Sequence, residues 1–127
     1  MKKTTTLAEA REEALAHNAK MNEAYKLALG DDALRIDPMI ARAACGLACE
    51  IVRRFPALEN PRLVPIEGGG AQLELQRGGR CLELQLMDTQ TICWLTADDP
   101  KAETTGECEV NDERTLFRIV AWLLKGD

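Results

Sequence analysis

The stretch from Val64 to Leu86 constrains the fold more strongly than any other part of the chain. It reads V-P-I-E-G-G-G-A-Q-L-E-L-Q-R-G-G-R-C-L-E-L-Q-L, so that apolar and polar residues alternate around two glycine clusters. Alternation with a period of two residues, interrupted by paired glycines, is typical of antiparallel strands joined by tight turns. The sequence therefore predicts a β-meander with one apolar and one polar face.

The second glycine cluster fixes the register of the two strands that flank it. A two-residue turn at Gly78-Gly79 and a four-residue loop give the same pairing, and a slip of one residue would expose the leucines. Glutamates placed directly opposite each other destabilise a sheet by about 0.2–1 kcal/mol, and we expect nothing on these two strands to relieve them. The predicted pairs are Arg77 with Arg80, Leu75 with Leu82, Leu73 with Leu84, Glu74 with Glu83, and Gln72 with Gln85.

The first glycine cluster predicts how the preceding strand, residues 63–67, joins the sheet. Val64 and Ile66 reach the buried face only if the loop holds an even number of residues, and a type I′ turn at Gly69-Gly70 satisfies that condition. Pro65 would then point outward. Because proline is tolerated on a strand with a single neighbour, we expect this segment to form an edge of the sheet.

An N-terminal helix is predicted from a capping box at Thr6 to a stop at Gly30. Its apolar stripe is thin, because it consists mostly of alanine. Such a stripe suits a surface helix on its own domain, or a helix that packs against another copy or a partner. The residues of the stripe are Leu7, Ala10, Ala14, Met21, Ala24, Tyr25 and Ala28.

Two further helices have stronger apolar faces. The first opens at Asp37-Pro38, with aspartate as the cap and proline in the first turn, and ends before Pro56. The second is capped by Asn111 or Asp112 and ends at Gly126. We expect both helices to pack on the apolar face of the meander.

The segment that follows Leu86 has two possible registers. A two-residue turn would bury Cys93 and Leu95 and send Ile92 and Trp94 outward, whereas a three-residue turn would do the reverse. A buried Trp94 is the favoured alternative, because tryptophan is highly buried on average. Residues 97–106 lack apolar periodicity and are predicted to form an acidic loop. The next four residues are predicted to form a short fifth strand with Cys108 and Val110 inward and Glu107 and Glu109 outward.

Together these segments predict an α+β fold with two N-terminal helices, an antiparallel meander of four to five strands and a C-terminal helix. The helices are expected on one face of the sheet. We interpret residues 1–127 as a single domain with its core in 37–127, and 1–30 as a candidate semi-independent segment. The open face of the sheet would carry Gln72, Glu74, Glu83, Gln85, Glu107 and Glu109.

The composition limits the partners and the compartment that we expect. The chain carries 16 basic and 21 acidic residues, and residues 98–127 alone hold four basic and eight acidic ones. This excess of negative charge disfavours direct nucleic-acid binding, which normally needs a basic patch. Five unpaired cysteines favour a reducing compartment, and no apolar run approaches the roughly 18 residues of a membrane span. We therefore expect a cytoplasmic protein that binds no membrane.

The inventory of reactive residues argues against most enzymes. The chain has no serine and a single histidine, His17, so that Ser-His-Asp chemistry is excluded and cysteine catalysis would need a thiol beside that histidine. Cys45 and Cys49 share a helix face and are a candidate metal pair, although two buried core thiols are the preferred interpretation. The glycine clusters join strand to strand and lack the frames of phosphate-binding loops. We expect no cofactor and no metal site.

The segments E-G-G-G-A-Q-L-E-L and C-L-E-L-Q-L, within Glu67 to Leu86, resemble those of small bacterial proteins of uncharacterised function, in which a G-G-x-x-L-E strand pairs with an L-E-[LI]-x-[LI] strand. The resemblance covers about twenty residues and implies a bacterial or mobile-element origin and an α+β fold, with no activity attached. In size and isoelectric point the chain is also similar to type III secretion chaperones, anti-CRISPR proteins, antitoxins and immunity proteins.

These observations favour a non-enzymatic module that docks on a basic surface of a partner protein and blocks or regulates it. One alternative is a chaperone or assembly factor that forms a homodimer through the first helix and the edge strand. A second is a small cysteine-dependent or metal-assisted enzyme. The candidate partner contacts are Gln72, Glu74, Glu83, Gln85, Trp94, Asp98, Asp99, Glu107 and Glu109.

Overall fold

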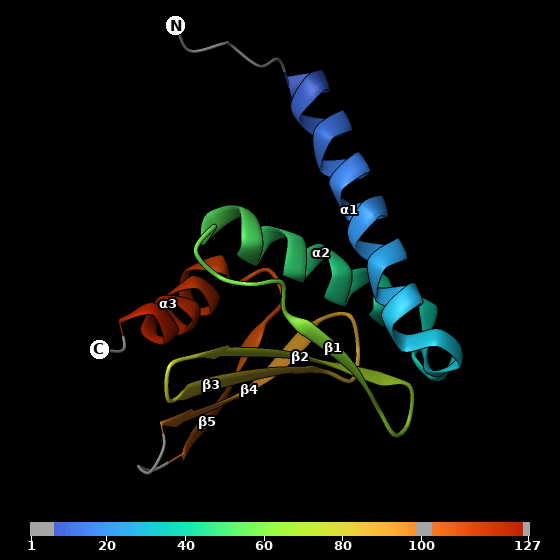
Figure 1. Cartoon of the computed structure of the whole chain (residues 1–127). Helices are drawn as coiled ribbons and strands as arrows, with labels where there is room; N and C mark the ends of the chain where they lie inside the picture. The colour runs from blue at the N-terminus through green and yellow to red at the C-terminus, as the bar shows by residue number, and fades with distance from the viewer. Residues whose placement is uncertain (1–6, 99–102, 126–127) are drawn as a thin grey trace, which may run out of the picture.

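The computed structural model describes residues 7–98 and 103–125, and in the first helix it describes every side chain from Asn18 onward (Figure 1). The helices are α1 (Leu7–Leu29), the 3₁₀ helix η1 (Gly30–Arg35), α2 (Pro38–Arg54) and α3 (Glu113–Leu124). The strands are β1 (Arg62–Ile66), β2 (Gly70–Arg77), β3 (Arg80–Leu86), β4 (Thr91–Asp98) and β5 (Glu103–Glu109). They form one antiparallel sheet in sequence order, with α2 and α3 on one of its faces. The predicted α+β fold is confirmed.

The hairpin of β2 and β3 has the predicted register. Arg77 pairs with Arg80 across the turn, and Gly78 adopts a positive φ of 61°, which suits the first central position of a type II′ turn. Glu74 lies opposite Glu83 in this register. The leucines that alternate with these glutamates all point toward the helices, where they are buried.

The predicted orientation of β1 is wrong by one residue. The loop after it spans residues 67–69 and so holds an odd number of residues, because Gly68 and Gly69, not Gly69 and Gly70, adopt positive φ values. Pro65 therefore lies on the covered side, whereas Val64 and Ile66 lie on the face opposite the helices. The expectation that this strand forms an edge of the sheet is confirmed.

On β4 the side chain of Trp94 points to the covered side, so that the favoured register is confirmed. Trp94 pairs with the fully buried Leu84 on one side and with Gly106 on the other. A Cβ atom on Gly106 would lie within 2.6 Å of Trp94 Cε2, so the indole ring occupies the space that a larger residue would need. Cys93 and Leu95 consequently lie on the uncovered face.

The acidic loop predicted for residues 97–106 is shorter than expected. Residues 97–98 still belong to β4, and β5 begins at Glu103, whose pairing partner is Ala97. The sequence pattern missed this pairing because the inward positions of β5 are occupied by threonine and glycine instead of large apolar residues. The inward Cys108 of the same strand is buried, as predicted.

The two covering helices begin at the predicted caps and meet each other over the sheet. The Asp37 carboxylate accepts hydrogen bonds from the backbone of Met39 and Ile40, and the Asp112 carboxylate accepts one from Thr115. Where the helices meet, the rings of Phe55 and Phe117 pack edge to face at 6.0 Å, and the Arg54 guanidinium stacks on Phe117. The fully buried large side chains of the core are Ile51, Leu73, Leu82, Leu84, Leu86, Ile92, Leu116, Leu123, Val120 and Pro61.

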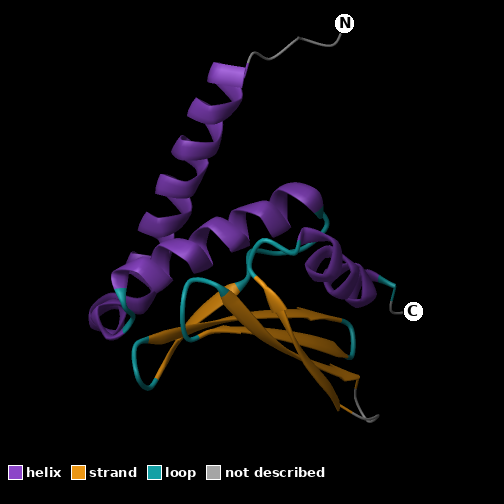
Figure 2. Ribbon diagram, turned by 180° about the vertical axis from the view of Figure 1, so that it is seen from behind, coloured by secondary structure: helices purple, strands orange, loops and turns teal. Residues whose placement is uncertain are grey.

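The described side chains that attach the first helix to this core belong to its C-terminal half. Tyr25 Oη donates a hydrogen bond to the carbonyl of Pro61 at 2.6 Å, and Cys45 Sγ donates one to the carbonyl of Asn18 at 3.3 Å. The N-terminal half extends away from the sheet and from α2 and α3 in both views (Figure 1, Figure 2). The predicted stop at Gly30 is confirmed, because α1 ends at Leu29 and Gly30, with a positive φ of 58°, begins η1.

Candidate functional site: the uncovered face of the sheet

Six of the nine predicted contact residues lie together on the face of the sheet that faces away from the helices (Figure 2). Five of the six belong to two rows that run across the strands. One row consists of Val64, Gln72, Gln85, Cys93 and Glu107. The second consists of Arg62, Glu74, Glu83, Leu95 and Thr105. Glu109 lies on the same face at the end of β5, opposite Thr91.

A short hydrogen-bond ladder connects the two rows. Gln85 Nε2 donates to Gln72 Oε1, and Gln72 Nε2 donates to Glu74 Oε2, both at 2.8 Å. Arg62 Nη1 lies 3.9 Å from Glu74 Oε1. The expectation that nothing on these two strands relieves the glutamate pair is wrong, because Gln72 on the same strand donates to Glu74. Arg62 on β1 adds an ion pair from a third strand. Glu83 forms no hydrogen bond or ion pair among the described residues.

A depression of about 250 Å³ lies beside this glutamate pair, where the linker before β1 passes the ends of β2 and β3. Glu59, Glu74 and Glu83 all line it, and Arg62 is the single cation in its lining. A guanidinium or ammonium group placed there would meet carboxylates from the linker and from both strands. Carboxylates arranged in this way suit charge-assisted hydrogen bonds to an arginine or lysine side chain.

Half-buried apolar side chains lie next to the carboxylates. Leu95 sits between Glu83 and Thr105 across the strands, and Val64 and Ile66 line the same face on β1. None of these three residues, nor Arg62, was among the predicted contacts, because β1 was expected in the opposite orientation and the β4 register had two alternatives. Three consecutive glycines also allow a loop with an odd number of residues. That alternative would have placed Val64 and Ile66 on the uncovered face.

The β4–β5 end of the face carries a thiol beside a carboxylate. Cys93 Sγ donates to Glu107 Oε1 at 3.7 Å. Partial burial raises the pKa of the Cys93 thiol, and the neighbouring Glu107 carboxylate raises it further. The thiol is therefore held in its protonated form, which is the less nucleophilic one.

Three of the predicted contact residues are not part of this face. Trp94 points toward the helices, and its buried indole N–H has no hydrogen-bond partner among the described residues. Asp98 lies on the covered side of the sheet, where its carboxylate pairs with Arg80 at 3.4 Å. Asp99 lies outside the described residues. The sequence offers Trp94 as a contact only in the less favoured register of β4. It predicts an acidic loop at residues 97–106, whereas Asp98 still belongs to β4.

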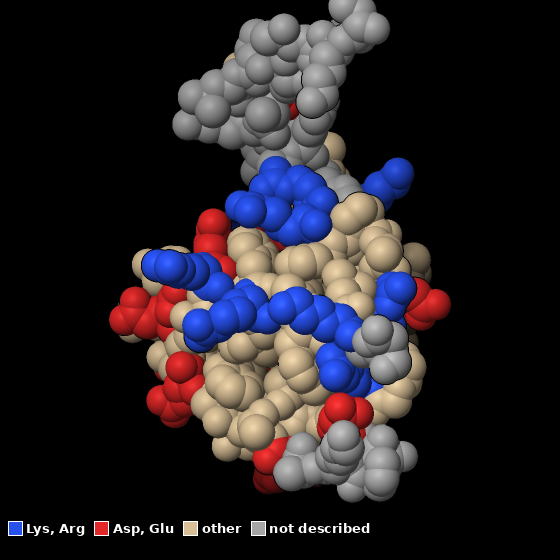
Figure 3. Space-filling model, turned by 90° about the vertical axis from the view of Figure 1, so that its left-hand side faces the viewer, with Lys and Arg blue, Asp and Glu red and all other residues tan. Residues whose placement is uncertain are grey.

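Basic residues concentrate on a different side of the molecule, along α3. Figure 3 shows a band of Lys and Arg side chains across the side formed by α3, the end of α2 and the β2–β3 turn. Arg114 and Arg118 are exposed on α3, and Lys125 is exposed at its C-terminal cap. Arg54 pairs with Glu113 at 3.5 Å, and Arg80 stacks on the indole of Trp122. The fold thus separates acidic and basic surfaces, which the net charge of the chain does not reveal.

The candidate metal pair on α2 is buried against α1. Burial raises the pKa of the Cys45 thiol, and burial together with the Cys45 thiol raises that of Cys49 to about 12. In the part of the chain that the structure describes, no three His, Cys, Asp or Glu side chains gather as metal ligands would. The side chain of His17 lies outside the described part.

Comparisons with protein families, with curated proteins and with solved structures find no match to this chain. The described helices include none with the length and apolar content that crossing a bilayer requires.

Proposed function

We propose that this chain is a protein-binding module that docks the uncovered face of its sheet on a basic segment of a partner protein and thereby blocks or regulates it. The observation that carries the proposal is the depression at the Glu74–Glu83 pair, where three glutamates and one arginine lie beside half-buried apolar side chains. Protein interfaces combine such apolar groups with charged groups around them.

Glu83 is the residue on which docking would depend most. Glu74 already interacts with Arg62 and Gln72, so that an incoming cation would find Glu83 as the unpaired carboxylate. The cation would also relieve the repulsion between the two glutamates, which the isolated protein retains. An exposed ion pair alone contributes about 0–1 kcal/mol, so the charges would mainly select the partner and speed encounter.

Apolar side chains on either side of the glutamates would supply contact area that charge alone does not provide. Leu95 is half-buried on β4 next to Glu83, and Val64 is half-buried on β1 next to Gln72. We therefore expect the partner segment to place an apolar side chain within a few residues of its arginine or lysine. The protonated state of the Cys93 thiol also favours a binding role for this face over a nucleophilic one.

The test is a comparison of three baits in lysate of the source cells. The first bait is the wild type, the second carries Glu74→Lys and Glu83→Lys, and the control carries Glu23→Lys and Asp31→Lys, which change the net charge equally at exposed positions away from the sheet. Proteins captured by the wild type are identified by mass spectrometry and titrated by calorimetry against all three.

We expect the sheet variant to lose affinity for the captured protein by about tenfold or more and the control to stay within about twofold. Circular dichroism of each bait checks that the fold is intact. Equal affinity of the sheet variant and the wild type would show that this face is not the binding site. Loss of affinity in the control alone would place the site on the helical side.

A further inference from the structure

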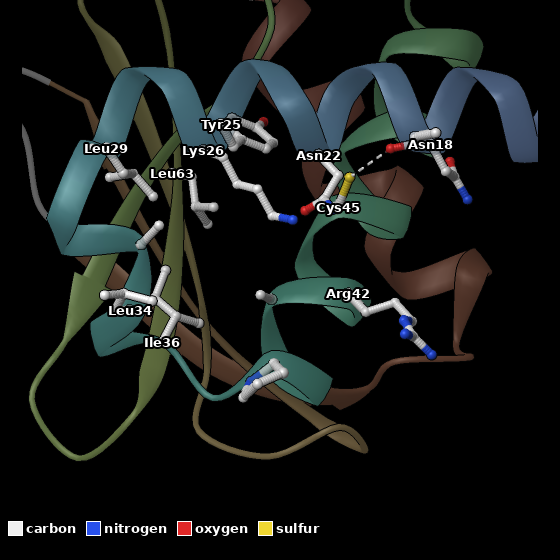
Figure 4. Close-up of a pocket in the computed structure, with 15 residues that line it drawn as sticks. Asn18, Asn22, Tyr25, Lys26, Leu29, Leu34, Ile36, Arg42, Cys45 and Leu63 are labelled. Atoms are coloured by element: carbon white, nitrogen blue, oxygen red, sulfur yellow. Dashed lines mark hydrogen bonds between the residues drawn. The ribbon is translucent and has the colours of Figure 1, made fainter.

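A groove of about 870 Å³ runs between the C-terminal half of α1 and the first turns of α2 (Figure 4). Its walls come from α1, η1 and α2, and Leu63 of β1 lies between them. Apolar side chains predominate in the lining, and Leu34 remains 87% exposed there. A leucine left this exposed on the wall of an apolar groove indicates a surface that accepts a further apolar element.

The groove is cationic although the chain as a whole is acidic. Lys26 on α1 and Arg42 on α2 are the two charged residues among the described side chains that line it. Neither cation forms an ion pair with another described residue. Figure 4 shows the Lys26 side chain reaching from α1 toward α2. The groove therefore suits an amphipathic helix that carries acidic residues.

The N-terminal half of α1 has the properties of such an occupant. Residues 7–17 hold three glutamates and one arginine, and they follow the helical apolar spacing of Leu7, Ala10 and Ala14. This half extends away from its own core in both views (Figure 1, Figure 2). The same helix therefore presents an acidic half that its own sheet does not cover and a second half that lines a cationic groove.

We propose that two copies of the chain form a dimer by antiparallel pairing of α1, each placing the N-terminal half of this helix along the groove of the other. A two-fold axis that passes close to Asn18, the midpoint of the 23-residue helix, brings residues 7–17 of one copy beside residues 19–29 of the other. Glu12 of one copy then lies level with Ala24 of the other, within one turn of Lys26. Such an interface is isologous, and both grooves are filled at once.

The proposed dimer is independent of the proposed function. The grooves and α1 lie on the helical side of the molecule, and the uncovered face lies on the opposite side of the sheet. Dimerisation would therefore present two copies of that face. A partner with two basic segments at a matching distance would gain affinity through both.

Analytical ultracentrifugation of the full chain over a range from 1 to about 200 µM tests the dimer. The matched variants are Leu34→Asp, at an exposed leucine in the groove, and Leu27→Asp, at an exposed leucine of α1 outside the groove. We expect a mass about twice the 14.0 kDa of one chain. We expect Leu34→Asp to raise the dimer dissociation constant by about tenfold or more and Leu27→Asp by less than about twofold.

A charge exchange distinguishes direct pairing from a general effect on folding. Lys26→Glu should weaken the dimer, and Glu12→Lys should weaken it as well. Mixing the two variants should restore a heterodimer in which opposite charges face each other in both grooves, as the original pair in one groove and as the reversed pair in the other. A protein that stays monomeric at about 200 µM, a dimer that Leu34→Asp leaves unchanged, or the absence of rescue would each overturn the proposal.

Discussion

The two faces of the sheet are built from alternate residues of the same strands and have different properties. On the covered face Leu73, Leu82 and Leu84 are completely buried beneath α2 and α3. On the uncovered face the residues that alternate with them include Glu74, Glu83 and Gln85, and the half-buried Leu95 lies beside Glu83 on the next strand. A period of two residues thus allows one segment to hold the core together and to present a charged surface. The covered face supplies the core, and the uncovered face is the one that we propose to bind a partner.

The largest expected difference between the faces is in the response to truncation of a leucine. Leu84→Ala should lower the free energy of unfolding by about 2–5 kcal/mol, because it opens a cavity in a fully packed core. Leu95→Ala, on the next strand and the opposite face, should lower it by less than about 1 kcal/mol. Urea unfolding measures both. Equal losses would mean that the uncovered face also contributes to the core.

The close approach of Trp94 and Gly106 gives the next prediction. Gly106→Ala places a methyl group against the indole ring and should cost about 1–3 kcal/mol, because the ring must shift within the covered face. Gly46→Ala in α2 is the matched control, since no neighbouring atom lies within 4 Å of its added Cβ. The control should be stabilised by about 0.5–1 kcal/mol. A neutral Gly106→Ala would show that the ring is free to move.

Removal of a charge should stabilise the uncovered face. Glu83→Gln should raise the free energy of unfolding by about 0.2–1 kcal/mol, because it removes the repulsion from Glu74. Glu74→Gln should raise it less, since that substitution also removes the interaction with Arg62. Unfolding at low and high salt separates the two effects. A greater gain from Glu74→Gln would contradict the arrangement described above.

Thiol labelling should show the smallest of these differences. Cys81 and Cys93 are half-buried on the uncovered face, whereas Cys45, Cys49 and Cys108 are buried, so the first two should react with a thiol reagent first. Because Glu107 raises the pKa of Cys93, Glu107→Gln should lower that pKa and increase the thiolate fraction. The labelling rate of Cys93 at pH 8 should then rise by about twofold or more. Cys81 serves as the internal control, and its rate should not change.

Local signals in the sequence predicted most of the fold. The register of β2 and β3 followed from the leucine pattern, because a slip would expose every leucine at once. The helix caps at Asp37 and Asp112 followed from their side-chain chemistry. The β1 register could not be predicted in the same way, since three consecutive glycines allow turns of odd or even length. The choice between the two depends on contacts with the rest of the chain, among them the hydrogen bond from Asp37 N to the Gly69 carbonyl.

The candidate site was predicted in part. The six polar residues on the uncovered face were predicted from strand periodicity. Arg62 was not, because the predicted orientation of β1 was wrong, and Leu95 was not, because two registers of β4 were possible. The basic side along α3 could not be predicted from the net charge. The net charge sums all acidic and basic residues, whichever surface of the folded protein they occupy. The groove beside α1 depends on the angle between two helices, and no local pattern encodes that angle.

The two outermost strands restrict how the sheet could grow by adding strands from other molecules. On β1, Pro65 offers no backbone N–H to an incoming strand. On β5, Glu103, Glu107 and Glu109 would lie beside identical carboxylates if a second copy added in register. The missing N–H on β1 and the repulsion between carboxylates on β5 both oppose the strand-by-strand addition of further copies that produces fibrils. Self-association of this chain is thereby directed away from the ends of the sheet and toward its helices.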